Sequence, residues 1–526
     1  MKKANNTLII KYAPLLLILA GFVLAAIPHL SLPHYWDESW SYATAVQLMY
    51  EKGPTLLPGI VDVEATRGHP LFFYAAAASW MKLFGATLIS KHSFALFIST
   101  LLLIAIYEVG YKLCNIRAAV LATLLFASQI FFFVQSSMLL PEIMVALLFF
   151  IAIYFFICEK YTALAVSLSL LFLTKESGLV LGLVLGLIFI ASLFNKEYLR
   201  SRKIKIFSAL LIPALIIICF FIIQKIHYGW FFFPEHIGLI DTNLNDFSAR
   251  FQDALFVIFI GEKRQWLWII IAALTVFYTI KKKDYKWLLF VWAIAMIFAF
   301  RYIPLDLFRK PIMTLIFIMY LLFVAAKYRA VIFSNKIQNK FTIIAVLFSI
   351  AYLIFCSVNF YTARYLMPIL LLSLIAFAYW LDTILKYLSI KIYAPFALVV
   401  AALSIQSYKN NNNIGDTGLG MYNALKVQQG IINFLADQNA QHQQISMASF
   451  QQKINMQNAA CGFISSNQAS FQNIRWEIDA LSKYIVFDNI EPDSRFETIK
   501  NNKNYKLVYQ IKKDNVWGMI FAKIEN

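Results

Sequence analysis

Long apolar runs, separated by short polar breaks, fill most of the first 407 residues. A helix needs about 20 mostly apolar residues to cross a bilayer, and about 17 is the lower limit. Thirteen runs therefore predict membrane-spanning helices, near residues 8–28, 94–111, 118–136, 142–158, 160–174, 177–194, 206–226, 266–280, 286–300, 311–326, 341–358, 366–385 and 392–407. The fifth run is as short as an interfacial or re-entrant segment, and without it every later segment would change sides.

Two longer polar segments interrupt the runs. Segment 29–93 contains two stretches that predict interfacial helices, near residues 38–51 and 70–84. The second stretch starts at Pro70, a residue type favoured in the first turn of a helix. Segment 227–263 is rich in aromatic and acidic residues. Both segments are long enough to carry structure of their own.

After the last run the pattern changes to shorter alternations. Residues 423–438 predict a helix. Four further stretches predict strands, at residues 445–450, 483–488, 505–511 and 517–524. Asp514 and Asn515 lie between the last two strands and predict a hairpin. We therefore expect a transmembrane domain over residues 1–407 and a small α/β domain outside the membrane over residues 408–526.

The composition excludes most classes of soluble protein. Hydrophobic residues make up 60% of the 526 residues and charged residues 14%, against roughly 45–50% and 25% in ordinary globular domains. A disordered chain, a collagen and a disulfide scaffold would need low hydrophobicity, periodic glycine or dense cysteine. Only five cysteines occur, and Cys461 alone lies in the polar tail. These values predict a polytopic α-helical membrane protein with about 13 transmembrane helices.

The net charge of +18 indicates orientation in a membrane and not nucleic-acid binding. Residues 408–526 hold 12 bases and 10 acids, so most of the excess belongs to the apolar part. There the bases concentrate in alternate breaks, such as 196–205 and 281–286, as the positive-inside rule requires of cytoplasmic loops. We expect a cytoplasmic N-terminus and a periplasmic C-terminal domain at a bacterial inner membrane. A cleaved signal peptide is the alternative for the first run, but no small-residue cleavage site follows it.

An acidic pair, Asp37 and Glu38, follows the first run on the predicted outer side. Adjacent carboxylates at a membrane face can act as a general base, as metal ligands or as a cation site. The alternative is structural. Asp37 could cap the helix predicted at 38–51 while Glu38 favours its positive end.

Further ionisable residues fall on the same predicted face, close to the apolar boundary. They are Arg67, His69, Glu142, Lys175, Glu176 and Arg364. Ionisable groups at this depth are costly, so they are candidates for function. A guanidinium such as that of Arg364 could hold a phosphate by two contacts. The alternatives are a simple interface anchor for Arg364, and snorkelling or mutual pairing for Lys175 and Glu176.

Segment 227–263 adds a run of aromatic rings that begins at Tyr228 and ends beside Glu235 and His236. Such rings could line a sugar or isoprenoid site, or they could form an interfacial aromatic belt. Glu235 and His236 could bind a metal, although two ligands are a weak signal. The chain contains no Walker-type or dinucleotide fingerprint, so we expect no nucleotide cofactor. A transferred group would have to arrive already activated.

Five stretches occur in a fixed order: WDE at 36–38, RGHPLFFY at 67–74, PEIMVALLFF at 141–150, LTKESGLVL at 173–181 and RYLMP at 364–368. Together they resemble the GT-C glycosyltransferases of the protein O-mannosyltransferase and lipid A aminoarabinose transferase type. The resemblance is best over residues 30–195 and extends more weakly to about residue 390. It implies a GT-C-like fold and an inverting transfer of a sugar from a polyprenyl-phosphate donor. The acceptor would be a lipid, glycan or protein on the outer face, with membrane lipids and no nucleic acid as further partners.

The resemblance also implies roles for individual residues. Asp37 would be the general base or a metal-organising carboxylate, with Glu38 beside it. Lys175, Arg364 and Arg67 would face the donor phosphate. Glu142 would lie near the acceptor or donor sugar. Apart from the resemblance, the residues themselves make His69, Glu176, Tyr228, Glu235 and His236 further candidates for substrate binding. A divalent metal, Mg²⁺ or Mn²⁺, could be held by Asp37, Glu38 and His236.

The chain departs from the family at one place. Many relatives have Lys-Pro-Pro where this chain has His69-Pro70-Leu71. A neutral imidazole cannot replace a fixed positive charge at every pH, which puts a phosphate-binding role for His69 in doubt.

A transporter or flippase for lipid-linked or soluble solutes is the alternative function. It predicts ionisable residues near mid-membrane and broken helices in two matching halves. The sequence shows neither pattern.

The predicted topology can be tested with reporter fusions. A reporter that is active only outside the cytoplasm should be active after residue 420 and inactive after residue 283, because these positions follow an odd and an even number of spans. An inactive reporter at 420 would remove one span and would divide the candidate residues between two faces.

Overall fold

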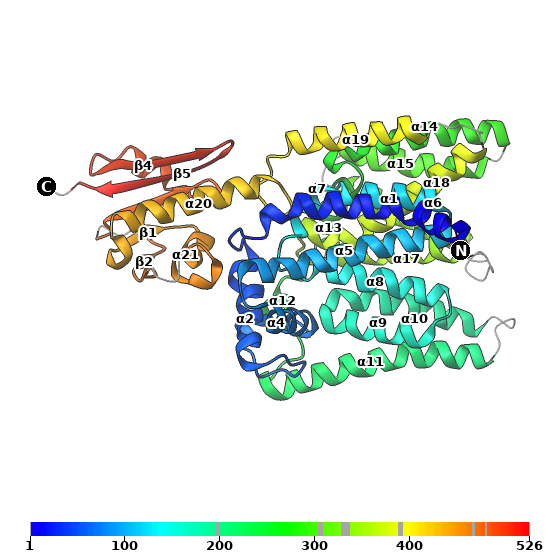
Figure 1. The fold of residues 1–526 in the computed structure, drawn as a ribbon, viewed down its shortest axis with the longest axis horizontal. Helices are drawn as coiled ribbons and strands as arrows, with labels where there is room; N and C mark the ends of the chain where they lie inside the picture. The colour runs from blue at the N-terminus through cyan, green and yellow to red at the C-terminus, as the bar shows by residue number, and fades with distance from the viewer. Residues whose placement is uncertain are drawn as a thin grey trace.

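The computed structural model describes residues 2–194, 200–283, 285–302, 309–327, 337–387, 393–464, 469–478 and 481–524. A bundle of helices forms the larger part, and a mixed α/β domain projects from one end of it (Figure 1). The described chain begins at the far end of the bundle and ends in the projecting domain.

A helix occupies every predicted run. The bundle helices are α1 (Lys2–Ala26), α5 (Leu88–Leu113), α6 (Ile116–Ala127), α8 (Glu142–Ile157), α9 (Tyr161–Thr174), α10 (Leu179–Leu193), α11 (Arg200–Tyr228), α14 (Arg264–Lys282), α15 (Leu288–Tyr302), α16 (Arg309–Lys327), α17 (Ile337–Val358), α18 (Met367–Tyr387) and α19 (Tyr393–Asn410). Among the described residues, six segments are long and apolar enough to cross a membrane, and four further apolar helices are shorter. The total of thirteen spans stays a prediction.

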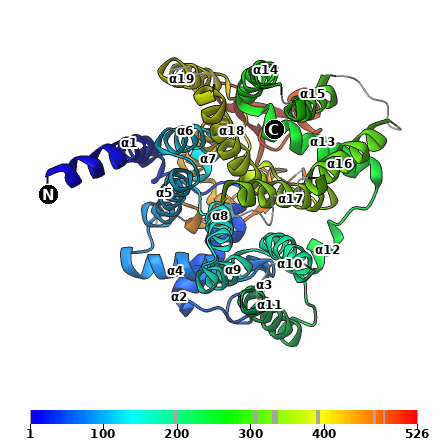
Figure 2. The same ribbon diagram turned by 90° about the vertical axis from the view of Figure 1, so that its right-hand side faces the viewer.

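The bundle surface is apolar where lipid would contact it. Leu17, Leu183 and Ile218 are exposed on α1, α10 and α11. In contrast, α8 is buried along most of its length and packs against α5, α9, α17 and α18, as the end-on view shows (Figure 2). The residues at the start of α8 therefore lie inside the protein.

The third predicted run is broken into two helices, α6 and α7 (Ile130–Gln135). Glu262 explains the break, because its carboxylate accepts hydrogen bonds from the backbone N–H groups of Ile130 and Phe131, at 2.9 and 3.1 Å. A carboxylate at a helix N-terminus satisfies otherwise unpaired donors and interacts favourably with the helix dipole.

Both helices predicted in segment 29–93 are present. The segment contains a π-helical turn, η2 (Glu38–Tyr42), followed by α2 (Ala43–Lys52), α3 (Val63–Thr66) and α4 (Phe72–Phe84). Segment 227–263 contains α12 (Pro234–Gly238) and the unpredicted α13 (Leu244–Phe259). Helices α2, α4 and α12 lie at the end of the bundle nearer the α/β domain (Figure 1).

The projecting domain is a five-stranded sheet with helices. Its elements are α20 (Gly420–Asp437), β1 (Ile445–Met447), α21 (Phe450–Gln457), β2 (Ile474–Arg475), β3 (Tyr484–Asp488), α22 (Phe496–Lys500), β4 (Tyr505–Lys513) and β5 (Val516–Lys523). The strand order is β2-β1-β3-β5-β4, with β1 parallel to both neighbours and β5 antiparallel to both of its neighbours. The predicted hairpin joins β4 to β5, and Asp514 takes a positive φ of 50° in its turn.

Asp488 is a buried acid at the end of β3. One carboxylate oxygen accepts hydrogen bonds from the backbone N–H groups of Ile490 and Glu491, at 2.9 and 3.0 Å. The other oxygen has no hydrogen-bond partner among the described residues. Burial raises the pKa of Asp488 to about 7, so the folded domain favours the neutral acid.

This acid gives the domain a predictable pH dependence. The pKa of Asp488 is about 7 in the folded chain, against an ordinary value of 3.8 for an exposed aspartate in the unfolded chain. The folded chain therefore binds the proton of Asp488 more tightly than the unfolded chain does. The contribution of Asp488 to the free energy of unfolding should fall as pH rises from about 4 to about 7. Asp488→Asn keeps an acceptor oxygen and removes the titration. Thermal unfolding of the purified chain at ~pH 5 and ~pH 8 should therefore show a smaller loss of Tm in the variant, and an equal loss would contradict this role.

Candidate functional site

Arg364 is a deeply buried charge at the domain-facing end of the bundle. It lies in η7 (Ala363–Leu366), just before α18, and is 1% exposed. Each nitrogen of its guanidinium faces a different carboxylate. Nη2 pairs with Asp37, Nη1 pairs with Asp416, and Nε lies 3.4 Å from Oε1 of Glu142.

Lys175 completes this group of charges. It follows α9 and precedes η3 (Glu176–Gly178). Its Nζ donates to Oε1 of Glu142 at 2.7 Å and lies 4.0 Å from the ring centroid of Tyr365. Glu142 is therefore shared between two cations. We call Asp37, Glu142, Lys175, Arg364 and Asp416 the ion-pair cluster.

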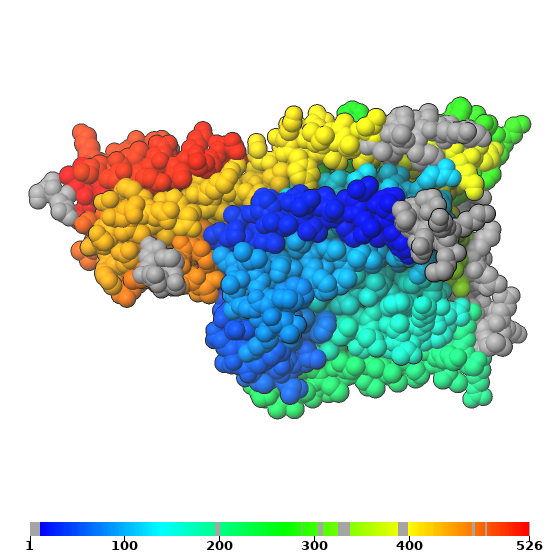
Figure 3. All heavy atoms as spheres, in the orientation of Figure 1, coloured from blue at the N-terminus to red at the C-terminus, as the bar shows by residue number. Residues whose placement is uncertain are grey.

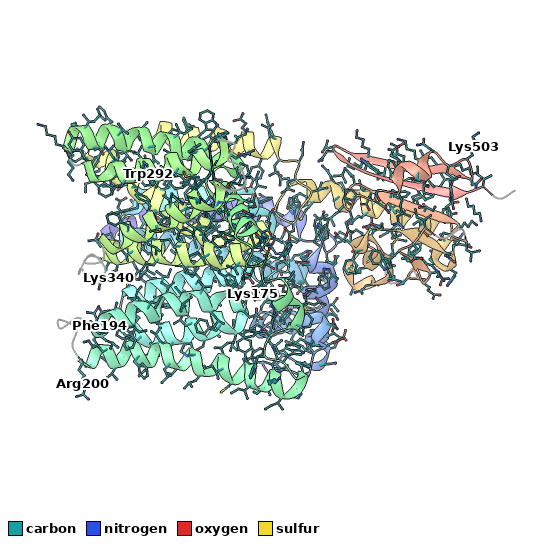
Figure 4. All side chains as sticks on the ribbon, turned by 180° about the vertical axis from the view of Figure 1, so that it is seen from behind. Lys175, Phe194, Arg200, Trp292, Lys340 and Lys503 are labelled. Carbon is teal, nitrogen blue, oxygen red and sulfur yellow. The ribbon has the colours of Figure 1, made fainter. Side chains whose placement is uncertain are left out.

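The cluster lies at one end of the bundle. In Figure 4, Lys175 is at the end nearer the α/β domain, whereas Phe194, Arg200 and Lys340 are at the opposite end. Arg200 and Lys340 lie in polar breaks between apolar runs, and the charge pattern predicts that these breaks are cytoplasmic. Of the residues proposed for the site from sequence, Asp37, Glu142, Lys175 and Arg364 meet in this cluster.

The electrostatics of the cluster favour charged side chains. Burial alone would raise the pKa of Asp37, but the guanidinium of Arg364 lowers it below its ordinary value. The side chain of Asp37 is 31% exposed, so it remains accessible while paired. Three carboxylates and two cations give the cluster a formal charge of −1.

A small cavity adjoins the cluster. Its lining includes Glu142, Lys175, Ser177, Tyr352, Arg364 and Tyr365. Oε2 of Glu142 is buried and has no hydrogen-bond partner among the described residues. A buried carboxylate oxygen without a donor is costly, so it is an available acceptor for the hydroxyl of a ligand.

The structural alternative for the acidic pair is wrong for Asp37. Asp37 precedes η2, but its side chain makes no capping hydrogen bond and instead accepts one from Nε1 of Trp40 at 3.2 Å. Trp36 has a positive φ of 49°, and after this turn Asp37 and Glu38 point to different partners. Glu38 is not part of the cluster, because its carboxylate contacts His34 and His92.

A second group of predicted residues meets beside α12. His69 Nδ1 lies 2.8 Å from Oε2 of Glu176, and the ring centroids of His69 and His236 are 4.7 Å apart. Arg67 pairs with Glu235 at 2.8 Å. Burial lowers the pKa of His236 to about 4, so its imidazole is neutral near pH 7.

These contacts contradict one further alternative. Lys175 and Glu176 do not pair with each other, because each binds a residue of another segment. The hydroxyl of Tyr228 accepts a hydrogen bond from the backbone N–H of Gly59 at 2.9 Å. The described contacts of Tyr228 therefore place it outside the ion-pair cluster.

The predicted metal set does not fit the structure. Asp37 is bound by Arg364, Glu38 by two histidines, and His236 lies in the group with His69. The residues His69, Glu176 and His236 do offer donor atoms within 4.8 Å of one another. No Mg²⁺ or Mn²⁺ site forms from Asp37, Glu38 and His236 in this arrangement.

Sequence reasoning missed Asp416, Trp40, Tyr365, His34 and His92. A signal existed for Asp416, since it is the first acid after the last run, on the predicted outer side. His92 lies two residues before the second run, where an imidazole has no distinctive neighbours in sequence. Its role depends on contacts with residues more than fifty positions away.

No sequence family matches the chain, and no curated protein matches it. Among solved structures, the chain is similar to ArnT from Cupriavidus metallidurans in the apo state, with 14% identity and a TM-score of 0.44 over 96% of this chain and 97% of that chain. The same protein bound to undecaprenyl phosphate gives 14% identity and a TM-score of 0.44, over 97% and 98%. An Archaeoglobus fulgidus oligosaccharyltransferase complex with Zn and sulfate gives 11% identity and a TM-score of 0.40, over 90% and 68%.

Asp37→Asn separates a chemical role of Asp37 from a structural one. The amide keeps the size of the side chain and can still accept from Trp40, so the chain should fold and be produced normally. If Asp37 takes a proton from the acceptor, transfer should slow by about 10²–10⁴-fold. Activity should be compared at matched protein amounts in membranes. A rate within a few-fold of the parent would remove Asp37 from the chemistry.

Proposed function

We propose that this chain is a membrane glycosyltransferase. It moves one sugar from a polyprenyl-phosphate donor to a lipid, glycan or protein acceptor at the outer face of a bacterial inner membrane. The observation that carries the proposal is the pair of buried cations, Arg364 and Lys175, which line one cavity beside the accessible carboxylate Asp37. The order of the five family-like stretches along the chain supports the same class.

A lipid-linked phosphate suits this location. The cations lie at the ends of apolar helices, where a polyprenyl tail can remain in lipid while its phosphate reaches the cavity. A guanidinium offers a planar fork of donors to phosphate oxygens, and an ammonium adds a point charge. The chain lacks the common nucleotide-binding fingerprints, which favours a donor activated elsewhere.

The carboxylates around Arg364 must give way to such a phosphate. Asp416 lies in the linker between α19 and α20, so its displacement would disturb no helix of the bundle. A phosphate that takes over the N–H groups of Arg364 also brings negative charge, which offsets the guanidinium that lowers the pKa of Asp37. Donor binding would then make Asp37 a stronger base at the moment when one is needed.

The proposed reaction is a single displacement at the anomeric carbon. Asp37 accepts the proton of the acceptor hydroxyl, whose oxygen forms a bond to that carbon. The bond from the same carbon to the phosphate oxygen breaks, and polyprenyl phosphate leaves with the bonding electrons. Lys175 and Arg364 stabilise the charge that grows on the phosphate. One displacement inverts the configuration of the sugar.

Binding of the leaving group tests the donor class. The purified chain should bind a polyprenyl phosphate, and should bind the corresponding polyprenol much more weakly, because only the phosphate engages the cations. Lys175→Gln should weaken binding by ~1.5–3 kcal/mol, the scale of a hydrogen bond to a charged group. Arg364→Lys should bind with intermediate affinity, since a point charge cannot reproduce the planar fork. Native mass spectrometry or a thermal shift measures these affinities.

Asp416→Asn provides the matched control, because it removes a competing carboxylate from the same guanidinium. Its affinity for the lipid phosphate should rise where that of Lys175→Gln falls. Equal binding of phosphate and polyprenol would contradict the donor class. Movement of an intact lipid-linked sugar across vesicles, with no transfer to any acceptor, would favour the flippase alternative.

A further inference from the structure

A separate group of ionisable side chains includes the sequence neighbour of Asp37, Glu38, and is almost completely buried. His34, Glu38 and His92 are 0%, 1% and 1% exposed. Their donor atoms form a small triangle. Oε1 of Glu38 lies 3.0 Å from Nδ1 of His34 and 2.8 Å from Nε2 of His92, and the two nitrogens are 3.1 Å apart. We call these residues the His34–Glu38–His92 triangle.

The hydrogen bonds of His92 limit its protonation. Its Nδ1 lies 2.9 Å from the backbone carbonyl oxygen of Leu30, which can only accept, so Nδ1 carries a proton. A neutral imidazole has one ring proton, and Nε2 of a neutral His92 is then a bare lone pair. That lone pair would face the Glu38 carboxylate and be repelled by it. A metal ion between these atoms, or a proton on Nε2, would remove this repulsion.

The hydrogen-bond count at Glu38 favours a metal ion. Oε1 already accepts a hydrogen bond from the backbone N–H of Leu139 at 2.6 Å. If both histidines also donate to it, three donors share an oxygen that offers about two lone-pair positions. The other oxygen, Oε2, accepts only from the backbone N–H of Tyr35 at 3.2 Å. A metal ion uses one lone pair of each triangle atom and leaves the second lone pair of Oε1 to Leu139.

The dimensions of the triangle suit zinc. Zinc bonds of about 2.0–2.1 Å in a tetrahedral site put neighbouring ligand atoms roughly 3.3 Å apart. The edges of the triangle, 2.8 to 3.1 Å, approach this spacing. A metal-ligating histidine usually donates its other N–H to a carbonyl or carboxylate, as His92 does to Leu30. Two imidazoles and one carboxylate suit zinc better than magnesium or calcium, which favour oxygen ligands.

We propose that His34, Glu38 and His92 bind a zinc ion that fixes the loop carrying Asp37. This inference goes beyond the proposed function and does not depend on it. Zinc joins the stretch after α1, the start of η2 and the first turns of α5. Trp36 lies between His34 and Glu38 in the sequence and has a left-handed backbone conformation. This conformation costs about 1–3 kcal/mol and persists only when the surrounding structure holds it.

The same ion would also support the contact between the bundle and the α/β domain. The backbone N–H of His34 donates to the carbonyl oxygen of Cys461 at 2.9 Å, and Trp40 packs edge-on against Phe450 with ring centroids 5.8 Å apart. Figure 3 shows the domain meeting segment 29–93 at this end of the molecule. Cys461 is not counted as a ligand, because its thiol donates to the carbonyl of Ser39 at 3.6 Å.

The metal content of the full-length chain tests the proposal directly. The protein should be purified without a polyhistidine tag or metal resin and analysed by elemental mass spectrometry. The parent should contain about one zinc ion per chain. Protein produced in cobalt-supplemented medium should show the ligand-field absorption of protein-bound cobalt, a readout that requires no variant.

Three variants locate the ion. His92→Asn removes the Nε2 ligand but keeps a donor for the Leu30 carbonyl, and His34→Gln removes the Nδ1 ligand. Both should lose most of the zinc and unfold at a lower temperature than the parent. His69→Gln is the matched control, because it removes a histidine from the other group and should leave the zinc content unchanged.

Two outcomes would overturn the proposal. A parent chain that holds no stoichiometric metal, and shows no cobalt absorption, would mean that a proton on His92 supplies the charge. Zinc that is lost in His69→Gln but retained in His92→Asn would assign the ion to His69, Glu176 and His236. Neither outcome bears on polyprenyl-phosphate binding, so a failure here is distinct from a failure of the proposed function.

Discussion

The burial of the Arg364 guanidinium is the constraint on which the rest of the site depends. A guanidinium cannot lose its proton at any relevant pH, so its charge must be balanced where it lies. The structure balances it with one carboxylate from segment 29–93, one from α8 and one from the stretch between α19 and α20. Removing the guanidinium would leave three carboxylates facing one cation, and an uncompensated buried charge costs several kcal/mol. The arrangement of the segments at this end of the bundle is therefore coupled to one side chain.

Adjacent residues in the acidic pair serve separate sites. Asp37 faces Arg364 and stays partly exposed, whereas Glu38 is buried against two imidazoles. The left-handed turn at Trp36 sets the direction in which both side chains leave the backbone. This division suits a catalytic site. The buried Glu38 holds the loop in place, and the partly exposed Asp37 can exchange one partner for another.

The sequence predicted the helices and four residues of the ion-pair cluster, but not the fifth, Asp416. Apolar length located the helices. Sidedness placed Asp37, Glu142, Lys175 and Arg364 on one face, together with residues that do not join the cluster, such as His69 and Glu176. Asp416 was missed because its one signal, its place as the first acid after the last run, does not by itself separate it from the other acids of the polar tail. The break between α6 and α7 escaped for a related reason. The capping group, Glu262, lies more than 130 residues away along the chain, so the sequence around the break does not predict the break.

The position of Asp416 gives the α/β domain a part in the electrostatics of the membrane region. Its side chain reaches Arg364, while its backbone carbonyl accepts a hydrogen bond from Gln135 at 2.7 Å, and α20 begins four residues later. A chain cut after α19 would keep every helix of the bundle yet lose one of the three negative charges at the guanidinium. The domain is thus not a detachable module, and swapping it between homologues would have to preserve the linker as part of the site.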